Sequence, residues 1–226
     1  MKTQKSHHAL IVATAVVVAL SGCATESSQS LPVPVVSSAQ TPFTGKPTEI
    51  AIGKFDNRSS YMRGIFSDGI DRLGGQARTI LITGLQQSRR FNVLDRDNLE
   101  EIKQEAGFLK KAQAVKGANF VVTGDVTEFG RKEVGDQELF GILGRAKQQV
   151  AYAKVSLNIV NTTTSEVVLS AQGAGEYSLS NREIIGFGGT ASYDSTLNGK
   201  VLDLAIQEAV NHLVEQVDAG ALNVAK

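Results

Sequence analysis

The hydrophobic period of this chain changes along its length, and this change limits the possible folds more than any other feature. From about residue 68 to 117 apolar residues recur at helical spacing, whereas over 119–160 and 171–198 they alternate with polar residues. The segment 202–217 returns to the i, i+3, i+4 pattern of a core-packed helix. With strands expected at 48–55 and 91–94, the order is β-α-β-α-β, then long β-hairpins, then α. We therefore predict an α/β or α+β body with helices packed on a sheet.

The first 23 residues have the pattern of a targeting segment. Two lysines precede an uncharged apolar run, Ala9 to Leu20, which is too short to cross a bilayer as a helix but suits a signal peptide. The following Leu20-Ser-Gly-Cys23 resembles the lipobox of bacterial lipoprotein precursors, which are cut before the cysteine and acylated on it. We predict a signal peptide over 1–22 and a durable lipid anchor at Cys23. Ala24, in place of Asp, points to the outer membrane, anchored from the periplasmic side.

Residues 23–46 are predicted to be a lipidated tether. They are rich in Ser and Thr and hold three of the four prolines, a composition typical of an extended linker. The alternative is an ordered strap that lies on a neighbouring subunit. The folded body would then cover 47–226.

Two local predictions concern the stretch between the second strand and the long strands. Asp97 and Glu100 have capping-box spacing at the start of a helix whose buried stripe would be Leu99, Ile102 and Ala106. Gly107 would end or bend that helix. A further short helix is expected over 109–117.

Two segments alternate small apolar residues with polar ones, 171–180 and 187–198, around a polar turn at 181–183. Such alternation is the signature of a transmembrane β-hairpin, apolar toward lipid and polar toward the lumen. Tyr177 and Tyr193 are candidate membrane-interface aromatics. The alternative is a half-buried soluble sheet, which such a pattern more commonly indicates. Because one chain has too few strands to close a barrel, the membrane interpretation requires a ring of subunits.

The preceding hairpin is less regular. Residues 129–149 carry many charges, and an Arg or Lys on the lipid face costs about 2–4 kcal/mol at mid-membrane. Only the central part, 139–143, is continuously apolar.

The chain offers little for catalysis or for cofactor binding. Cys23 is the only cysteine, and after removal of the signal peptide His212 is the only histidine, so metal sites and Ser-His chemistry are not expected. The crowded carboxylates at 95–101 begin a helix, where capping and the helix dipole explain them. Lys+Arg and Asp+Glu are equal at 23 each, which gives no basic excess for nucleic acid. We predict no enzyme activity, no cofactor, no metal and no nucleic-acid partner.

Several segments taken in order resemble one family. With the lipobox and the strand-helix-strand start, they resemble the curli secretion channel lipoproteins, the CsgG/HfaB family, over about 47–220; the segments are Phe91-Asn-Val-Leu-Asp-Arg-Asp-Asn-Leu-Glu-Glu-Ile102, Gly117-Ala-Asn-Phe-Val-Val-Thr-Gly124 and Val155-Ser-Leu-Asn-Ile-Val-Asn-Thr-Thr-Thr-Ser-Glu-Val-Val168. The resemblance implies an anticodon-binding-domain-like periplasmic body. It also implies hairpins at about 121–160 and 166–200 that join an oligomeric transmembrane β-barrel. Such a ring of identical chains passively exports curli-like or surface-anchored proteins, with accessory periplasmic proteins as partners.

The same resemblance implies that the loop between the first strand and the first helix lines the channel constriction. Its residues here are Ser59, Ser60, Tyr61, Met62, Arg63, Gly64, Ile65, Phe66, Ser67, Asp68 and Gly69. The family's aromatic–Asn–aromatic set would align with Gly64, Asp68 and Gly69, whereas Tyr61 and Phe66 lie off register. This departure keeps a second function open: a non-spanning periplasmic lipoprotein that binds or regulates an envelope partner.

Overall fold

The computed structural model describes residues 35–61, 69–137, 145–183 and 197–222 of the 226-residue chain. The chain divides into two compact units, Met1–Val33 and Pro34–Lys226, and the second holds every described element. These are the short 3-10 helix η1 (Ser37–Gln40), the helices α2 (Arg72–Gln87), α3 (Leu99–Phe108) and α4 (Leu197–Asp218), and the strands β1 (Thr48–Asn57), β2 (Phe91–Leu94), β3 (Phe120–Gln137), β4 (Arg145–Asn161) and β5 (Val167–Glu183).

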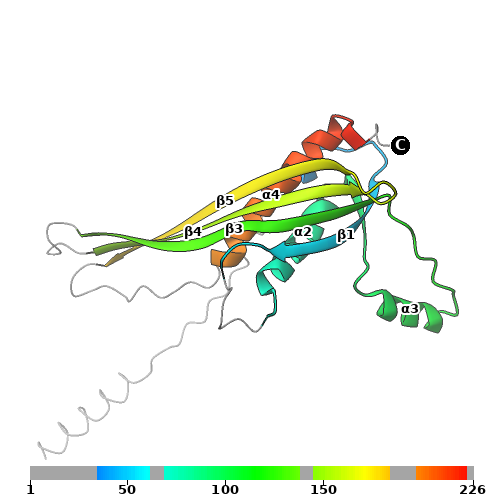
Figure 1. Cartoon of the computed structure of the whole chain (residues 1–226), viewed down its shortest axis with the longest axis horizontal. Helices are drawn as coiled ribbons and strands as arrows, with labels where there is room; N and C mark the ends of the chain where they lie inside the picture. The colour runs from blue at the N-terminus through cyan, green and yellow to red at the C-terminus, as the bar shows by residue number, and fades with distance from the viewer. Residues whose placement is uncertain (1–34, 62–68, 138–144, 184–196, 223–226) are drawn as a thin grey trace, which may run out of the picture. The chain divides into compact units, whose positions relative to one another are not determined.

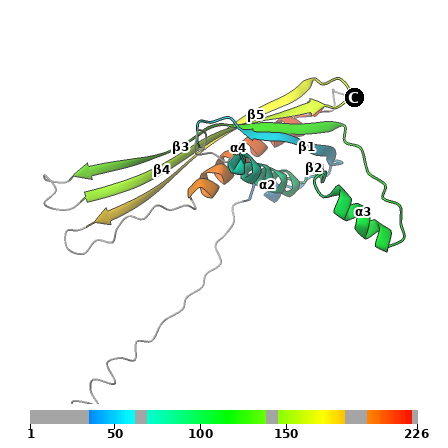
Figure 2. The ribbon, with the colours of Figure 1, turned by 60° about the horizontal axis from the view of Figure 1, so that its bottom comes forward.

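The strands form a single five-stranded sheet in the order β2-β1-β3-β4-β5 (Figure 1). β1 is parallel to both β2 and β3, and the β3-β4 and β4-β5 pairs are antiparallel. Helices α2 and α4 lie on the same side of the sheet (Figure 2). The predicted α+β body with helices on a sheet is therefore confirmed.

One continuous hydrophobic core lies between these two helices and the sheet. Its largest fully buried side chains come from every layer and include Ile50, Leu81, Phe91, Leu157, Ile159, Leu202, Ile206 and Leu213. The opposite face of the sheet, called the open face below, carries Lys154 and Glu128, which form an ion pair at 2.9 Å. Because one face of the sheet is packed and the other is solvated, apolar and polar residues alternate along the strands.

The glycine-rich alternation of β5 is explained by its packing on α4. A Cβ atom at Gly173 would collide with the backbone of Ala205 and Ala209, and one at Gly175 would lie 2.8 Å from the carbonyl oxygen of Val201. Ala171 on the same side is 6% exposed. The small residues of 171–175 thus let the α4 backbone approach the strand. Over this part of the segment, the structure therefore has the half-buried sheet that was the alternative to a transmembrane hairpin.

Part of the predicted tether is in contact with the body. Val36 is fully buried, and the guanidinium of the buried Arg90 donates to the carbonyl of Ser38 at 2.9 Å and to the carboxylate of Asp218 at 2.9 Å. The same guanidinium lies 5.0 Å from the centre of the Phe43 ring. Residues 36–43 are therefore a strap on the chain's own body, although their composition predicts a linker.

Four local predictions are wrong. No residue of α3 is buried, so Leu99, Ile102 and Ala106 form no buried stripe. Residues 109–117 form no helix. Asp97 does not cap α3: Asn98 stands at the N-cap position without a side-chain cap bond. Leu197 and Asn198, expected in a strand, begin α4, and the rest of that segment, 187–196, lies outside the described residues.

We predict that Gly173→Ala destabilises the protein by about 1–3 kcal/mol, because the added methyl group forces β5 and α4 apart. For a chain of this size each kcal/mol corresponds to about 2–4 °C in Tm, measured by circular dichroism on the full chain. Ala174→Ser, on the exposed neighbouring position, is the matched control and should leave Tm unchanged. Equal Tm values for Gly173→Ala and the native chain would contradict the close packing.

Candidate functional site

The predicted constriction loop leaves the sheet where β1 ends. The pairing of β1 with β3 stops at Asn57 opposite Val126, and the backbone amides of Arg58 and Ser59 both donate to the Val126 carbonyl, at 2.9 and 3.1 Å. Of the loop, Ser59, Ser60, Tyr61 and Gly69 are described, whereas Met62 to Asp68 lie outside the described residues. The structure therefore describes the part of the candidate site that attaches the loop to the body. This part, residues 57–61 and 69–71, is called the loop root below.

The two ends of the loop are joined by one carboxylate. Asp71, the N-cap of α2, accepts the Gly74 amide at 2.8 Å with one oxygen and the Asn57 amide at 2.6 Å with the other. An N-cap carboxylate satisfies amides that have no partner inside the helix. Here it also ties the end of β1 to the start of α2.

Asn57 closes the first turn of the loop. Its side chain is buried, and its Oδ1 accepts from the Ser59 hydroxyl at 2.6 Å and from the Ser59 amide at 3.0 Å. Its Nδ2 donates to the carbonyl oxygen of Tyr61 at 2.9 Å. This Asx-type turn fixes the backbone of 57–61.

Tyr61 connects the loop root to β3 and to α4. Its ring lies 4.6 Å, centre to centre, from the ring of Phe129, and Asn198 Nδ2 donates to its hydroxyl at 3.0 Å. Tyr61 is partly buried against the hydrophobic core, and Phe129 is 4% exposed. Tyr61 therefore packs inside the body, while Phe66 lies outside the described residues.

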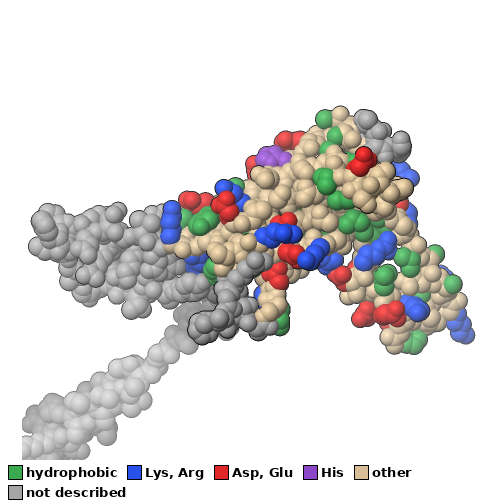
Figure 3. Space-filling model, viewed as in Figure 1, with side chains coloured by type: hydrophobic (Ala, Val, Ile, Leu, Met, Phe, Trp, Pro, Cys, Tyr) green, Lys and Arg blue, Asp and Glu red, His purple; other side chains and the backbone are tan. Residues whose placement is uncertain are grey.

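The charges around the loop root are paired rather than gathered into one sign. Arg58 Nε and Asp125 Oδ1 are 2.5 Å apart, and the hydrogen bond and charge of Asp125 raise the pKa of the Arg58 guanidinium. Basic and acidic side chains also lie next to one another over the body in Figure 3. At the described loop root, paired charges of this kind partly cancel each other's field.

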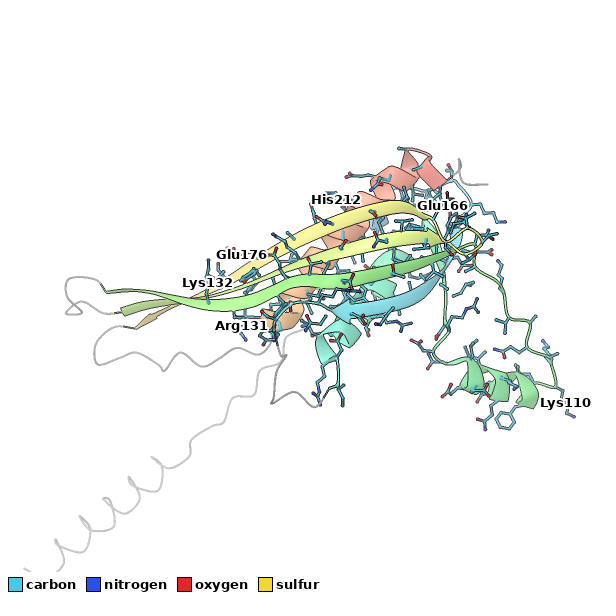
Figure 4. The ribbon with its side chains drawn as sticks, viewed as in Figure 1. Lys110, Arg131, Lys132, Glu166, Glu176 and His212 are labelled. Atoms are coloured by element: carbon cyan, nitrogen blue, oxygen red, sulfur yellow. The ribbon has the colours of Figure 1, made fainter. Side chains whose placement is uncertain are left out.

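The remaining sequence-derived candidates fall in different places. Tyr177 is partly buried against the core, with the Lys200 ammonium 4.9 Å from its ring centre, so the structure places it between β5 and α4. Tyr193 and Cys23 lie outside the described residues. Figure 4 places Lys132 and Glu176 on the strands, toward the end that lies away from α3, and Lys110 at the end of α3.

Sequence reasoning missed the partners of the loop root. Asp71 carried a usable signal, because an Asp directly before helical apolar spacing is an N-cap candidate, but the apolar spacing placed the helix start near 68. Phe129 and Asn198 carried no local signal, since their role depends on contacts with a residue 68 or 137 positions away.

Within the described ranges, 35–61, 69–137, 145–183 and 197–222, no helix is both long and apolar enough to cross a membrane. Nor do these ranges contain a group of three or more His, Cys, Asp or Glu side chains placed to hold a metal ion.

Comparison with known proteins gives one family and one similar sequence. The model of the family described as "Curli production assembly/transport component CsgG" matches residues 33–225. The chain is 68% identical over 211 residues to the candidate lipoprotein NMB1126/NMB1164 of Neisseria meningitidis serogroup B, covering 93% of this chain and 95% of that one.

Three solved structures are similar at low identity. A hemagglutinin homologue from Helicobacter pylori has a TM-score of 0.45 and 12% identity, over 82% of this chain and 96% of that one. The lipoprotein GNA1162 from Neisseria meningitidis has 0.36 and 14%, over 76% and 99%. A PelC dodecamer subunit from Paraburkholderia phytofirmans has 0.36 and 13%, over 75% and 91%.

The packing of Tyr61 predicts how substitutions there change stability. Tyr61→Phe keeps the ring on Phe129 but removes the hydrogen bond from Asn198, and should cost about 0.5–1.5 kcal/mol in urea unfolding of the full chain. Tyr61→Ala removes the ring as well and should cost more. Ser60→Ala, on the exposed neighbour, is the control and should cost nothing. If Tyr61→Ala were as stable as the native chain, the ring would not be part of the core.

Proposed function

The chain belongs to the curli production assembly/transport (CsgG) family, and from this premise we propose that it is an outer-membrane lipoprotein whose copies form a ring and contribute strands to a passive protein secretion channel. The cargo would be curli-like or surface-anchored subunits, as the family implies, delivered with accessory periplasmic proteins. Lipid at Cys23 would hold each copy at the periplasmic side of the outer membrane. No step in this function is enzymatic.

One observation carries the proposal: three strands continue past the end of β1, and their last pairs lie beyond the buried core. Beyond the last β1 pair, Asn57 with Val126, β3 and β4 remain paired over ten further positions, from Glu128↔Lys154 to Gln137↔Arg145. β5 continues beside them to Glu183, which pairs with Arg145. We call these parts of β3, β4 and β5 the strand extension. The first half of the extension still packs on the core, to which Phe129, Ala151 and Tyr177 belong or pack. Beyond the buried Val150, the described β3-β4 pairs run over five positions, from Glu133↔Gln149 to Gln137↔Arg145. This is about half of the 9–11 residues that a tilted transmembrane strand needs.

Both edges of the sheet are blocked on the body by helix side chains. Gln86 of α2 accepts the Val93 amide of β2 at 3.2 Å. On the other edge, Gln216 of α4 donates to the Ser170 carbonyl of β5 at 3.1 Å, and a ring nitrogen of His212 lies 2.8 Å from the Gln172 carbonyl. Covered edges of this kind resist pairing with other chains.

This blocking stops at the level where β1 ends. Val126, the last partner of β1, pairs with Val155, which pairs with Gly173, directly after the last blocked carbonyl at Gln172. Among the residues that the structure describes, no strand pairs with the outer side of β3 or β5 beyond this level. Two edges that no described strand covers favour strand addition by copies on both sides, and a closed ring would remove every edge.

The loop root supports the proposed place of the constriction. Asn57 and Tyr61 hold the loop 59–69 where the extension begins, beside Phe129 of β3. In this proposal the loop 59–69 lines the narrowest part of the channel, and Tyr61 at its root packs against the core.

A specific observation favours the second candidate, a tethered periplasmic lipoprotein that binds or regulates an envelope partner. The alternation over Ala171, Gly173 and Gly175 reflects contact with α4, so this part of the pattern needs no lipid. The open face at the same level carries the exposed Lys154–Glu128 ion pair. In this function the extension would bind a partner instead of crossing the membrane.

Negative-stain imaging of the full lipoprotein, extracted from outer membranes in mild detergent, separates the two functions. The channel predicts rings with a central hole and a detergent belt around the strand end, because the open edges pair between copies. Monomers or small closed particles, with membrane attachment lost in Cys23→Ser, would contradict the channel and establish the tethered protein.

A further inference from the structure

The strap (36–43) is held at its start by the two helices that cover the sheet. Val36 is fully buried. A Cβ atom at Gly84 of α2 would lie 3.5 Å from a methyl carbon of Val36 and 3.6 Å from one of Val210 in α4, so Val36 lies where the two helices meet. The chain therefore joins the body at a defined point.

Arg90 holds the rest of the strap. This residue is 3% exposed, and its guanidinium donates to the Ser38 carbonyl at 2.9 Å, to the Thr41 carbonyl at 3.2 Å and to the Thr41 hydroxyl at 2.9 Å. The same guanidinium lies over the Phe43 ring and is paired with the Asp218 carboxylate. Because an unpaired buried charge is costly, the strap and Arg90 stabilise each other.

The strap shortens the tether that precedes it. Thirteen residue steps separate Val36 from Cys23, the proposed lipid site, and at 3.3–3.6 Å per extended residue they reach about 45 Å at most. If the strap were detached, the tether would leave the body at Thr48, the first residue of β1, and would reach about 85 Å. Residues 36–47 are thus stored on the body.

The tether leaves the body near the level at which the proposed membrane part begins. α4 runs along β5 (Figure 1), and a Cβ atom at Gly173 would lie 3.0 Å from the Cβ atom of Ala209, whose neighbour in α4 lies beside Val36. Leu179, six residues farther along β5, pairs with Gln149 in the first row beyond the buried core. Six residues of strand span about 20 Å, so a tether that reaches about 45 Å extends to this row and beyond it.

We propose that the strap sets the working length of the lipid tether and keeps residues 36–47 in reserve. This role depends on the proposed channel, because the strand extension can enter the membrane only if the lipid at Cys23 reaches the same membrane from the body. The effective concentration of a tethered group falls roughly as the −3/2 power of tether length. By halving the tether, the strap raises the effective concentration of the extension at the membrane about threefold.

Shortening the tether tests this role in intact cells. The readout is labelling of Ile185→Cys with a membrane-impermeant maleimide, while lipid blocks Cys23. Removal of residues 25–34 leaves three steps between Cys23 and Val36, a reach of about 10 Å, which is too short for a distance of about 20 Å. We expect labelling to fall at least tenfold. Replacement of the same residues by Gly and Ser keeps the length and should leave labelling unchanged.

Detaching the strap should restore labelling in the shortened chain. Val36→Asp together with Phe43→Ser removes the two apolar anchors of the strap and leaves the body unchanged. Fifteen steps then separate the lipid from β1, a reach of about 50 Å. Ser37→Asp together with Gln40→Ser, at exposed positions of the strap, is the matched control and should not restore labelling.

The results separate the strap from the channel. Labelling of the shortened chain with its strap intact would overturn the length limit. Failure of the detached strap to restore labelling would overturn the reserve. If residue 185 were not labelled in the chain of native length either, the channel itself would be contradicted, and the role of the strap with it.

Discussion

The close approach of α4 to the glycine face of β5 is the contact on which the rest of the structure depends. Gly173 and Gly175 let the helix backbone reach the strand, and α4 then supplies a large part of the core, including Leu202, Ile206 and Leu213. The same position brings His212 and Gln216 to the edge of β5 and Asn198 to Tyr61. Core, blocked edge and loop root are therefore consequences of one helix-strand packing.

The two features proposed for the channel meet at one level of the fold. The strand extension begins where β1 and the edge-blocking side chains end, and the loop root lies at that level. In the channel, the place of strand pairing between copies and the place of the constriction loop would therefore both be set by the end of β1.

The sequence predicted what depends on local pattern. The α+β class, the C-terminal helix and the family follow from period and motif order, and the structure and the comparisons confirm them. The helix expected over 109–117 does not form, and residues 197–198 of an expected strand begin α4. The stripe on α3 failed because helical spacing predicts an apolar face, whereas burial depends on whether another element packs against that face, and no residue of α3 is buried. The alternation over 171–177 was ambiguous because small residues suit both lipid and a close helix. Phe129 and Asn198 could not be found, since only the fold brings them to Tyr61.

The most direct test of the central claim, that the strand extension crosses the outer membrane, is labelling of one introduced cysteine in intact cells with a membrane-impermeant maleimide. Ile185→Cys lies just beyond the described end of β5, and Thr163→Cys lies in the turn at the opposite end of β4 and β5. The account predicts that residue 185 is labelled in intact cells and that residue 163 is labelled only after the outer membrane is permeabilised. If both residues required permeabilisation, the extension would lie in the periplasm and the channel would be contradicted.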